Sequence, residues 1–259
     1  QLSEAQFSEA AKNLVKVAVA LDELAKNHGR IIRLAIEPEP GCVFSFTQDL
    51  VDFYEQHLCR GLSESQEQLV RTHIQVCHDI CHSAVMFEDQ ADVLERYHRV
   101  GIQIAKFQVS SAVRMNLEEL PACGTERDSA IAQLREFNEP KYLHQTMVQR
   151  GADAPRFYED LNLALEAEAD ENVPDRLFGQ WRVHFHVPIF LERFGRLQST
   201  QDEIEKCLLA AKRWTNCRHW EVETYAWGVL PAELRQMPLS DGIARELAWL
   251  TERVPQSEF

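Results

Sequence analysis

Apolar residues recur at helical spacing over the first part of the chain. Between residues 3 and 27 they are Phe7, Ala11, Leu14, Val17, Ala18, Leu21 and Leu24. This spacing predicts an amphipathic helix over 3–27. Gly29 is expected to end it, because glycine adopts the left-handed conformation of a helix C-cap without strain.

Beyond this helix, short apolar segments alternate with helical ones. We predict strands at 31–36, 72–77, 102–110, 141–148 (where a short helix also fits), 181–190 and 220–227, and helices at 49–59, 63–71, 82–100, 157–169, 200–215 and 231–254. Ser63 followed by Gln66 is typical of a capping box. The segment 111–140 is interpreted as a polar, helical insertion. The alternation of strand and helix predicts an α/β protein with a parallel sheet and helices outside it.

The number and spacing of the strands favour a (β/α)8 TIM barrel over an open sheet. No glycine-rich phosphate loop follows any predicted strand, so a nucleotide-binding fold loses its usual support. A TIM barrel begins with a strand and has eight of them, whereas this chain begins with a helix and offers fewer. We therefore expect residues 1–259 to be a single domain, the C-terminal part of a barrel whose first strands are missing, with a gap or an open edge before the strand at 31–36.

Composition narrows the class of partner. The net charge of −14 argues against a nucleic-acid-binding surface and favours a small molecule. No apolar segment reaches the roughly 18 residues of a membrane span, and residues 1–27 lack the pattern of a secretory signal. The seven cysteines are scattered, which predicts reduced thiols and a cytoplasmic protein. Cys77 and Cys81 are interpreted as the end of a buried strand and the start of a helix, in preference to zinc ligands.

Strand alternation separates an apolar face from a polar one. In 73–79, for example, Ile74 and Val76 would face the helices. The side chains placed on the opposite, inner face of the strands are Arg33, Ala35, Glu37, Gln75, Cys77, Asp79, Lys106, Gln108, Ser110, His184, His186, Glu221 and Glu223. Burying ionisable groups costs several kcal/mol each unless they are paired or bind a metal. We therefore interpret this face as functional, against the alternative of a satisfied polar network without function.

Several of these residues lie in motifs that resemble the xylose isomerase-like barrel superfamily of sugar isomerases, epimerases and endonuclease IV-like proteins. That superfamily has a metal-binding Glu after its fourth strand, an Asp-x-x-His after its fifth and a metal-binding Glu after its eighth. Here IEPEP offers Glu37, CHDICHSA offers Asp79 and His82, and EVETY offers Glu223. The stretches EPEPGC, HFHVPIF and ETYAW also look like the EboE branch of metabolite traffic proteins. Members of that branch are encoded beside a prenyltransferase-like protein and are linked to export of secondary-metabolite precursors.

The resemblance implies a divalent metal, namely Mn, Mg, Zn or Co, and a sugar-like polyol or related metabolite as substrate. It assigns the metal ligands Glu37, Asp79, Gln108 and Glu223, the proton-transferring residues Glu37 and Glu223, and the substrate-binding residues His82 and Arg114. His144, His184 and His186 are further substrate-binding candidates, which could instead make up for the weaker ligand Gln108 or form a second metal site. Arg114 stands six residues beyond Gln108, as a substrate-binding Arg does in epimerases. Gln108 departs from the family, which usually has His there, and an amide oxygen is a poorer ligand for softer metals. Glu39 is the reserve ligand if the strand register shifts by two.

Three other functions remain open at this stage. The pair His184 and His186 suits a binuclear metallohydrolase, and we predict that this pair is functional because neutral imidazoles bind metal or accept a substrate proton. Lys106 suits a Schiff-base aldolase. The non-catalytic alternative is a metabolite-binding or traffic protein on the same barrel, associated with a membrane prenyltransferase-like partner. Bound metal would favour the enzymes, and a metal-free pocket would favour the carrier.

Overall fold

The computed structural model describes residues 2–121, 123–169, 177–223 and 225–254. It is a mixed α/β structure, which confirms the predicted class. The chain divides into two compact units, which are described separately below. The first comprises Gln1–Asp79, Ala91–Gln108 and Leu209–Glu221, and the second comprises Ile80–Gln90, Val109–Leu208 and Val222–Phe259.

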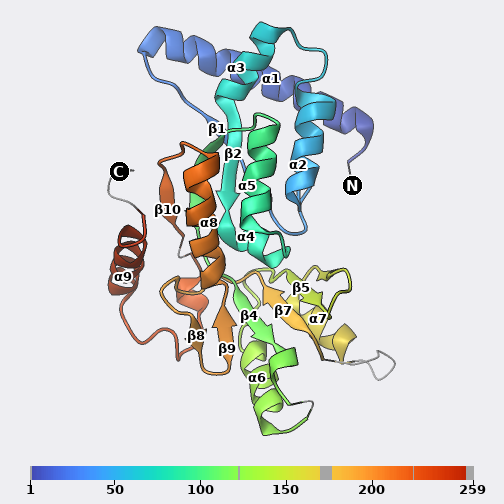
Figure 1. Ribbon diagram of the computed structural model, residues 1–259, viewed down its shortest axis with the longest axis vertical. Coiled ribbons are helices and arrows are strands. Elements are labelled where there is room, and N and C mark those ends of the chain that lie inside the picture. Colours follow the sequence, from blue (N-terminus) through green and yellow to red (C-terminus); the bar gives the residue numbers. More distant parts are fainter. Residues whose placement is uncertain (1, 122, 170–176, 224, 255–259) are drawn as a thin grey trace. The chain divides into compact units, whose positions relative to one another are not determined.

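The helices of the first unit follow the sequence pattern closely. Helix α1 (Glu4–His28) begins at a Ser3–Gln6 capping box and ends at Gly29, whose φ of 66° is left-handed. Helix α3 (Glu64–His73) begins at the predicted box of Ser63 and Gln66 and packs beside α1 (Figure 1). Helix α2 (Thr47–Phe53) continues into the π-helical turn η1 (Tyr54–Leu58), and α5 (Gln90–Arg99) precedes the third strand.

The sheet of the first unit carries the predicted parallel strands. Its order is β1 (Leu34–Ile36), β2 (Ile74–Asp79), β3 (Ile104–Val109) and β10 (Trp220–Val222). Strands β1 and β2 pair in parallel, as do β2 and β3. Strand β1 lies at one edge and leaves Ile31, Ile32 and Leu34 exposed beside it.

Side-chain alternation holds in this sheet. Phe107 stacks on Trp220 with ring centroids 4.1 Å apart, and His78 meets Phe107 edge-on at 5.7 Å. These rings lie on the apolar face that the pattern predicts. Cys77 and Gln108 meet on the other face, where the Cys77 Sγ lies 3.2 Å from the Gln108 Oε1. Cys77 lies within β2, not at its end.

The second unit contains a six-stranded antiparallel sheet, so the prediction that all strands are parallel is wrong here. Its order is β6 (Arg156–Tyr158), β5 (Thr146–Gln149), β7 (Gln180–Val183), β4 (Val113–Asn116), β9 (Leu197–Ser199) and β8 (Arg193–Phe194). Strand β4 pairs with β7 and β9, both distant in sequence. The segment 111–140, predicted as helical, thus contributes this strand as well as the turn η2 (Leu117–Glu119) and helix α6 (Thr125–Arg135).

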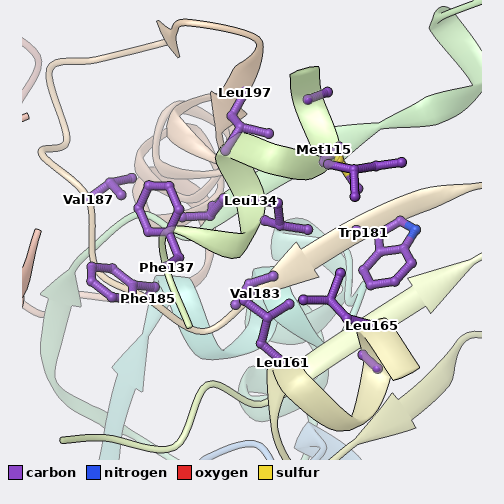
Figure 2. Packing of buried hydrophobic residues seen from close by; sticks show 14 of the residues in the cluster. Met115, Leu134, Phe137, Leu161, Leu165, Trp181, Val183, Phe185, Val187 and Leu197 are labelled. Atoms are coloured by element: carbon purple, nitrogen blue, oxygen red, sulfur yellow. The ribbon is translucent and has the colours of Figure 1, made fainter. Parts of the chain in front are cut away.

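The predicted strand 181–190 ends at Val183, yet its alternation continues. The backbone N–H of His184 donates to the Gln145 carbonyl at 2.8 Å, and that of Val187 donates to the Ser111 carbonyl at 3.0 Å. Figure 2 shows Val183, Phe185 and Val187 within the core, beside the helices α6 and α7 (Leu161–Glu168). The predicted apolar face of this segment is confirmed, although loop bonds hold its second half.

Of the remaining predicted elements, only the helix at 200–215 has nearly its predicted length, and the others are shorter. Helix α4 (Ile80–Val85) follows β2 directly, and α8 (Gln201–Trp214) agrees with the helix predicted at 200–215. The strand predicted at 220–227 becomes β10 and the helical turn η3 (Tyr225–Val229), and Thr224 between them lies outside the described residues. Helix α9 (Leu239–Thr251) begins after Pro238.

Within the described ranges, the strands form these two sheets and no closed barrel. None of the described helices is long and apolar enough to cross a bilayer. No disulfide bond links cysteines among the described residues.

Candidate functional site

Three of the predicted metal ligands lie together in the first unit. Glu37 follows β1, Asp79 ends β2 and Gln108 is close to the end of β3. The Gln108 Nε2 donates to the Glu37 Oε1 at 2.8 Å and to the Asp79 Oδ2 at 3.0 Å. The carboxyl ends of parallel strands meet at one edge of a sheet, which is the usual place for chemistry in α/β proteins.

Gln108 faces the two carboxylates with its amide nitrogen, and its amide oxygen accepts from the Cys77 thiol at 3.2 Å. An amide group binds a metal through oxygen, so a ligand role requires a half-turn of this amide. As placed, the NH2 group occupies the position between two carboxylates that a cation would otherwise take. Carboxylate oxygens are the donors that Mn²⁺ and Mg²⁺ prefer, so Glu37 and Asp79 fit such an ion directly.

A second cluster, built from nitrogen and sulfur donors, lies wholly in the second unit. One ligand atom from each of Cys81, His184 and His186 lies within 4.8 Å of the other two, and all three residues are buried. His82 is adjacent, with its ring centroid 4.6 Å from that of His184 and 6.3 Å from that of His186. The sequence predicts functional roles for the histidines but not for Cys81.

Glu223, predicted as a ligand and a catalytic residue, belongs to this unit and lies beside His186. Its Oε2 is 3.5 Å from the His186 Nδ1, and its backbone N–H donates to the Val109 carbonyl at 3.3 Å. At this distance the carboxylate attracts a proton on the Nδ1 side of the ring electrostatically, without a recorded hydrogen bond to it.

His144, predicted to bind substrate, is packed among buried groups. Its Nε2 lies 3.3 Å from the Glu139 Oε1, its Nδ1 lies 3.4 Å from the His184 carbonyl, and its ring is 5.0 Å from that of Phe185. These contacts give it a structural role beneath His184. A substrate-binding role for His144 stays a prediction.

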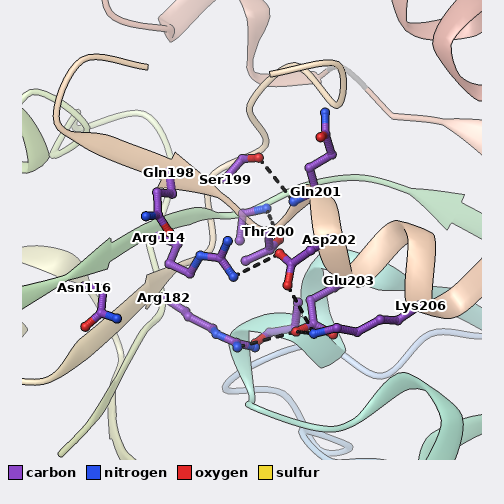
Figure 3. Close-up of polar contacts among 12 residues, drawn as sticks. Arg114, Asn116, Arg182, Gln198, Ser199, Thr200, Gln201, Asp202, Glu203 and Lys206 are labelled. Atoms are coloured by element: carbon purple, nitrogen blue, oxygen red, sulfur yellow. Dashed lines mark hydrogen bonds and ion pairs between the residues drawn. The ribbon is translucent and has the colours of Figure 1, made fainter. Parts of the chain in front are cut away.

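Arg114, also predicted to bind substrate, lies in a group of charged residues shown in Figure 3. Its Nη1 is 2.9 Å from the Asp202 Oδ1. Burial would raise the pKa of Asp202, but Arg114 and Lys206 outweigh it and lower that pKa. Arg182, which the sequence interpretation missed, pairs with Glu203 at 3.5 Å and is buried. The guanidinium of Arg114, which the sequence predicts to bind substrate, thus forms an ion pair with Asp202.

Two further candidates lie in the first unit. The Lys106 Nζ is 2.6 Å from the Glu221 Oε2. Burial would lower the pKa of Lys106, but the hydrogen bond to Glu221 and the charges of Cys77, Glu221 and Glu37 together outweigh it and raise that pKa. A protonated lysine is a poor Schiff-base nucleophile, so the pairing with Glu221 does not favour the aldolase alternative. Glu39, the reserve ligand, lies in the loop after β1, where its backbone N–H donates to the Phe44 carbonyl at 2.9 Å.

The fold and these two clusters define an α/β protein with candidate metal-binding groups. No family model, no curated protein and no solved structure matches this chain. The function proposed below is therefore inferred from the geometry of the two clusters.

Proposed function

We propose that this protein is a divalent-metal-dependent isomerase or epimerase of the xylose isomerase-like barrel type, acting on a sugar-like polyol in the processing or traffic of a metabolite in the cytoplasm. One observation carries the proposal. Glu37, Asp79 and Gln108, from three neighbouring parallel strands, are joined by hydrogen bonds of 2.8 and 3.0 Å. Three distant parts of the sequence are thus brought to one strand-end cluster.

The chemistry of these donors supports an oxygen-preferring ion. When bound, Mn²⁺ or Mg²⁺ supplies polarisation of a carbonyl and a neighbouring hydroxyl oxygen of the substrate. Glu37 would move the proton at the carbon next to that carbonyl, which is the general-base step of such reactions. Asp79 would hold its carboxylate against the ion, and the Gln108 amide would turn to present its oxygen. His82, Arg114 and Glu223 belong to the second unit, and the roles that the family resemblance implies for them stay predictions.

A second candidate function is a metabolite carrier without turnover. The observation that favours it is the orientation of Gln108, whose NH2 group donates to both carboxylates. A histidine at this position would offer a single proton or a lone pair there. Gln108 therefore gives the cluster a stable metal-free form.

Metal titration and deuterium exchange separate the two functions. Protein purified without chelator would be titrated with MnCl2, and then incubated in D2O with a panel of aldoses and ketoses and examined by proton NMR. The enzyme predicts Mn²⁺ binding and deuterium at the carbon next to the carbonyl. Glu37→Gln and Asp79→Asn should each weaken Mn²⁺ binding by at least about tenfold, as loss of a ligand exceeds loss of a supporting contact.

Gln108→His is the most informative variant, because it supplies the imidazole that the family usually has. It should tighten Mn²⁺ binding and keep or raise exchange. Glu221→Gln, which removes a carboxylate from the exposed pair with Lys106, is the matched control and should leave Mn²⁺ binding unchanged. Absence of Mn²⁺ binding in both the wild type and Gln108→His, with no exchange, would contradict the enzyme and leave the carrier.

A further inference from the structure

We propose that Cys81, His184 and His186 form a zinc-binding site in the second unit. This inference goes beyond the proposed function, because it concerns a different donor set, a different metal and residues of one unit alone. Among the described residues, these three place one ligand atom each within 4.8 Å of one another. Tetrahedral zinc with bonds of about 2.0–2.3 Å has ligand atoms roughly 3.3–3.8 Å apart. Small side-chain rotations would bring atoms within the 4.8 Å limit to this spacing.

The donor set selects the metal. A thiolate and two imidazoles are soft and borderline ligands, which favour Zn²⁺ over Mg²⁺ or Mn²⁺. The Cys81 side chain packs among Val85, Met86, Ala112 and Met147. In these apolar surroundings a thiolate is costly without a cation beside it. Zinc would remove that cost, so binding should be coupled to deprotonation of the thiol.

Supporting contacts orient both imidazoles as they do in known zinc sites. The His184 Nδ1 lies 2.8 Å from the Gln145 Oε1, and the His186 Nδ1 lies 3.5 Å from the Glu223 Oε2. The Gln145 acceptor favours the His184 tautomer with its proton on Nδ1, which leaves the Nε2 lone pair of that ring for a metal, while the Glu223 carboxylate faces the Nδ1 side of His186 at ion-pair distance. Glu223 thereby acquires a role that the sequence did not suggest, as an orienting carboxylate for His186.

The backbone fixes the three residues in place. The Cys81 N–H donates to the Ser110 Oγ at 3.2 Å, so the first turn of α4 is held by the loop after β3. His184 and His186 alternate with Val183, Phe185 and Val187, which lie in the apolar core (Figure 2). The core thus sets the direction of both rings, as a preorganised ligand set requires. Three protein ligands leave the fourth zinc position for water or a small ligand, as in catalytic zinc sites.

Zinc and cobalt binding test the proposal directly. Metal-free wild-type protein would be titrated with ZnCl2 in competition with a chromogenic chelator, and separately with CoCl2 under reducing conditions. We expect one equivalent of bound zinc, and with cobalt a thiolate charge-transfer band in the near ultraviolet. Cys81→Ser should abolish that band and weaken zinc binding at least about 100-fold, and His184→Gln and His186→Gln should weaken it comparably. Gln145→Leu, which removes only an orienting acceptor, should weaken it about tenfold.

Matched controls make each outcome decisive. Cys207→Ser removes another buried thiol of the second unit and should leave both zinc affinity and the cobalt spectrum unchanged. Far-ultraviolet circular dichroism of each variant identifies any that fail to fold. The cobalt spectrum of the wild-type protein tests thiolate ligation even if a variant does not fold. A folded Cys81→Ser protein with wild-type zinc affinity, or cobalt binding without the charge-transfer band, would overturn the proposal. So would zinc binding that is lost on Glu37→Gln but kept on Cys81→Ser. Failure of Mn²⁺ binding or of exchange would leave the zinc site standing.

Discussion

Glu246 is a buried carboxyl group whose charge state should control the stability of the second unit. It lies on α9 with no exposed surface, and its Oε1 accepts the backbone N–H of Ile189 at 3.0 Å. The other oxygen, Oε2, is buried and has no hydrogen-bond partner among the described residues. Burial raises the pKa of Glu246 from 4.5 to about 7, and the bond from Ile189 only partly opposes this.

The sign of the effect follows from which state holds the proton. Between pH 4.5 and about 7 the folded protein keeps a proton on Glu246 that the unfolded chain has lost. The stabilising contribution is therefore complete below pH 4.5, falls as the pH rises, and is lost above about pH 7. At about 1.4 kcal/mol per pH unit, this shift corresponds to roughly 3 kcal/mol of unfolding free energy.

Glu246→Gln removes the charge while keeping the shape and the acceptor for Ile189. At pH 8 the variant should be more stable than the wild type by about 2–3 kcal/mol, because it avoids the buried carboxylate. At pH 5 the two should agree within about 1 kcal/mol, since the wild-type carboxyl is then largely protonated. Urea unfolding followed by circular dichroism at both pH values measures this difference, and titration of all other groups cancels in the comparison.

Glu233→Gln is the control, because it removes the same charge from an exposed position. Its effect on stability should be within about 0.5 kcal/mol at both pH values. The reasoning would be refuted by a Glu246→Gln protein whose stability relative to the wild type is the same at pH 5 and pH 8. That result would mean that Glu246 is solvated in the folded state.

Two further substitutions test the packing of the second unit. Gly242→Ala should destabilise this unit by about 1–3 kcal/mol in thermal unfolding, because the added methyl group overlaps the Trp227 ring. This cost should exceed the gain from the better helix propensity of alanine. Gly228→Ala is the control, because a methyl group added there meets nothing within 4 Å. Arg182→Met should cost about 1–3 kcal/mol in urea unfolding because it removes a buried partner of Glu203, which keeps its ion pair with Lys206. A loss below about 0.5 kcal/mol would show that the Arg182–Glu203 pair is effectively solvated.

Local signals predicted the helices well. The capping boxes at Ser3 and Ser63 and the left-handed Gly29 mark helix ends through contacts within a few residues, so the sequence alone contains them. Strand pairing is different, because partners come from distant parts of the chain. Strand β4 was interpreted as part of a helical insertion, and only its antiparallel pairing with β7 and β9 makes it a strand.

Alternation predicted more of the candidate site than strand boundaries did. It placed Asp79 and Gln108 on one face of the parallel sheet, and the hydrogen bonds among Glu37, Asp79 and Gln108 agree with that placement. It also held for His184 and His186 beyond the end of β7, because Val183, Phe185 and Val187 still alternate into the apolar core. A buried apolar face therefore determines side-chain direction even where the ladder of backbone bonds has ended.

Strand alternation makes no prediction for residues at a strand-to-helix junction, so it gave no reason to prefer a zinc-ligand role for Cys81 over a structural one. Cys81 lies in the first turn of α4, two residues after the end of β2, where the period changes from two to 3.6. The two clusters differ in their donor atoms because their residues come from different elements. The strand ends of the first unit supply oxygen donors, whereas the turn and the loop-bonded segment of the second unit supply sulfur and nitrogen. Because hard and soft donors prefer different ions, Mn²⁺ and Zn²⁺ should report on the two clusters separately, and Glu37→Gln and Cys81→Ser should each affect mainly one of the two titrations.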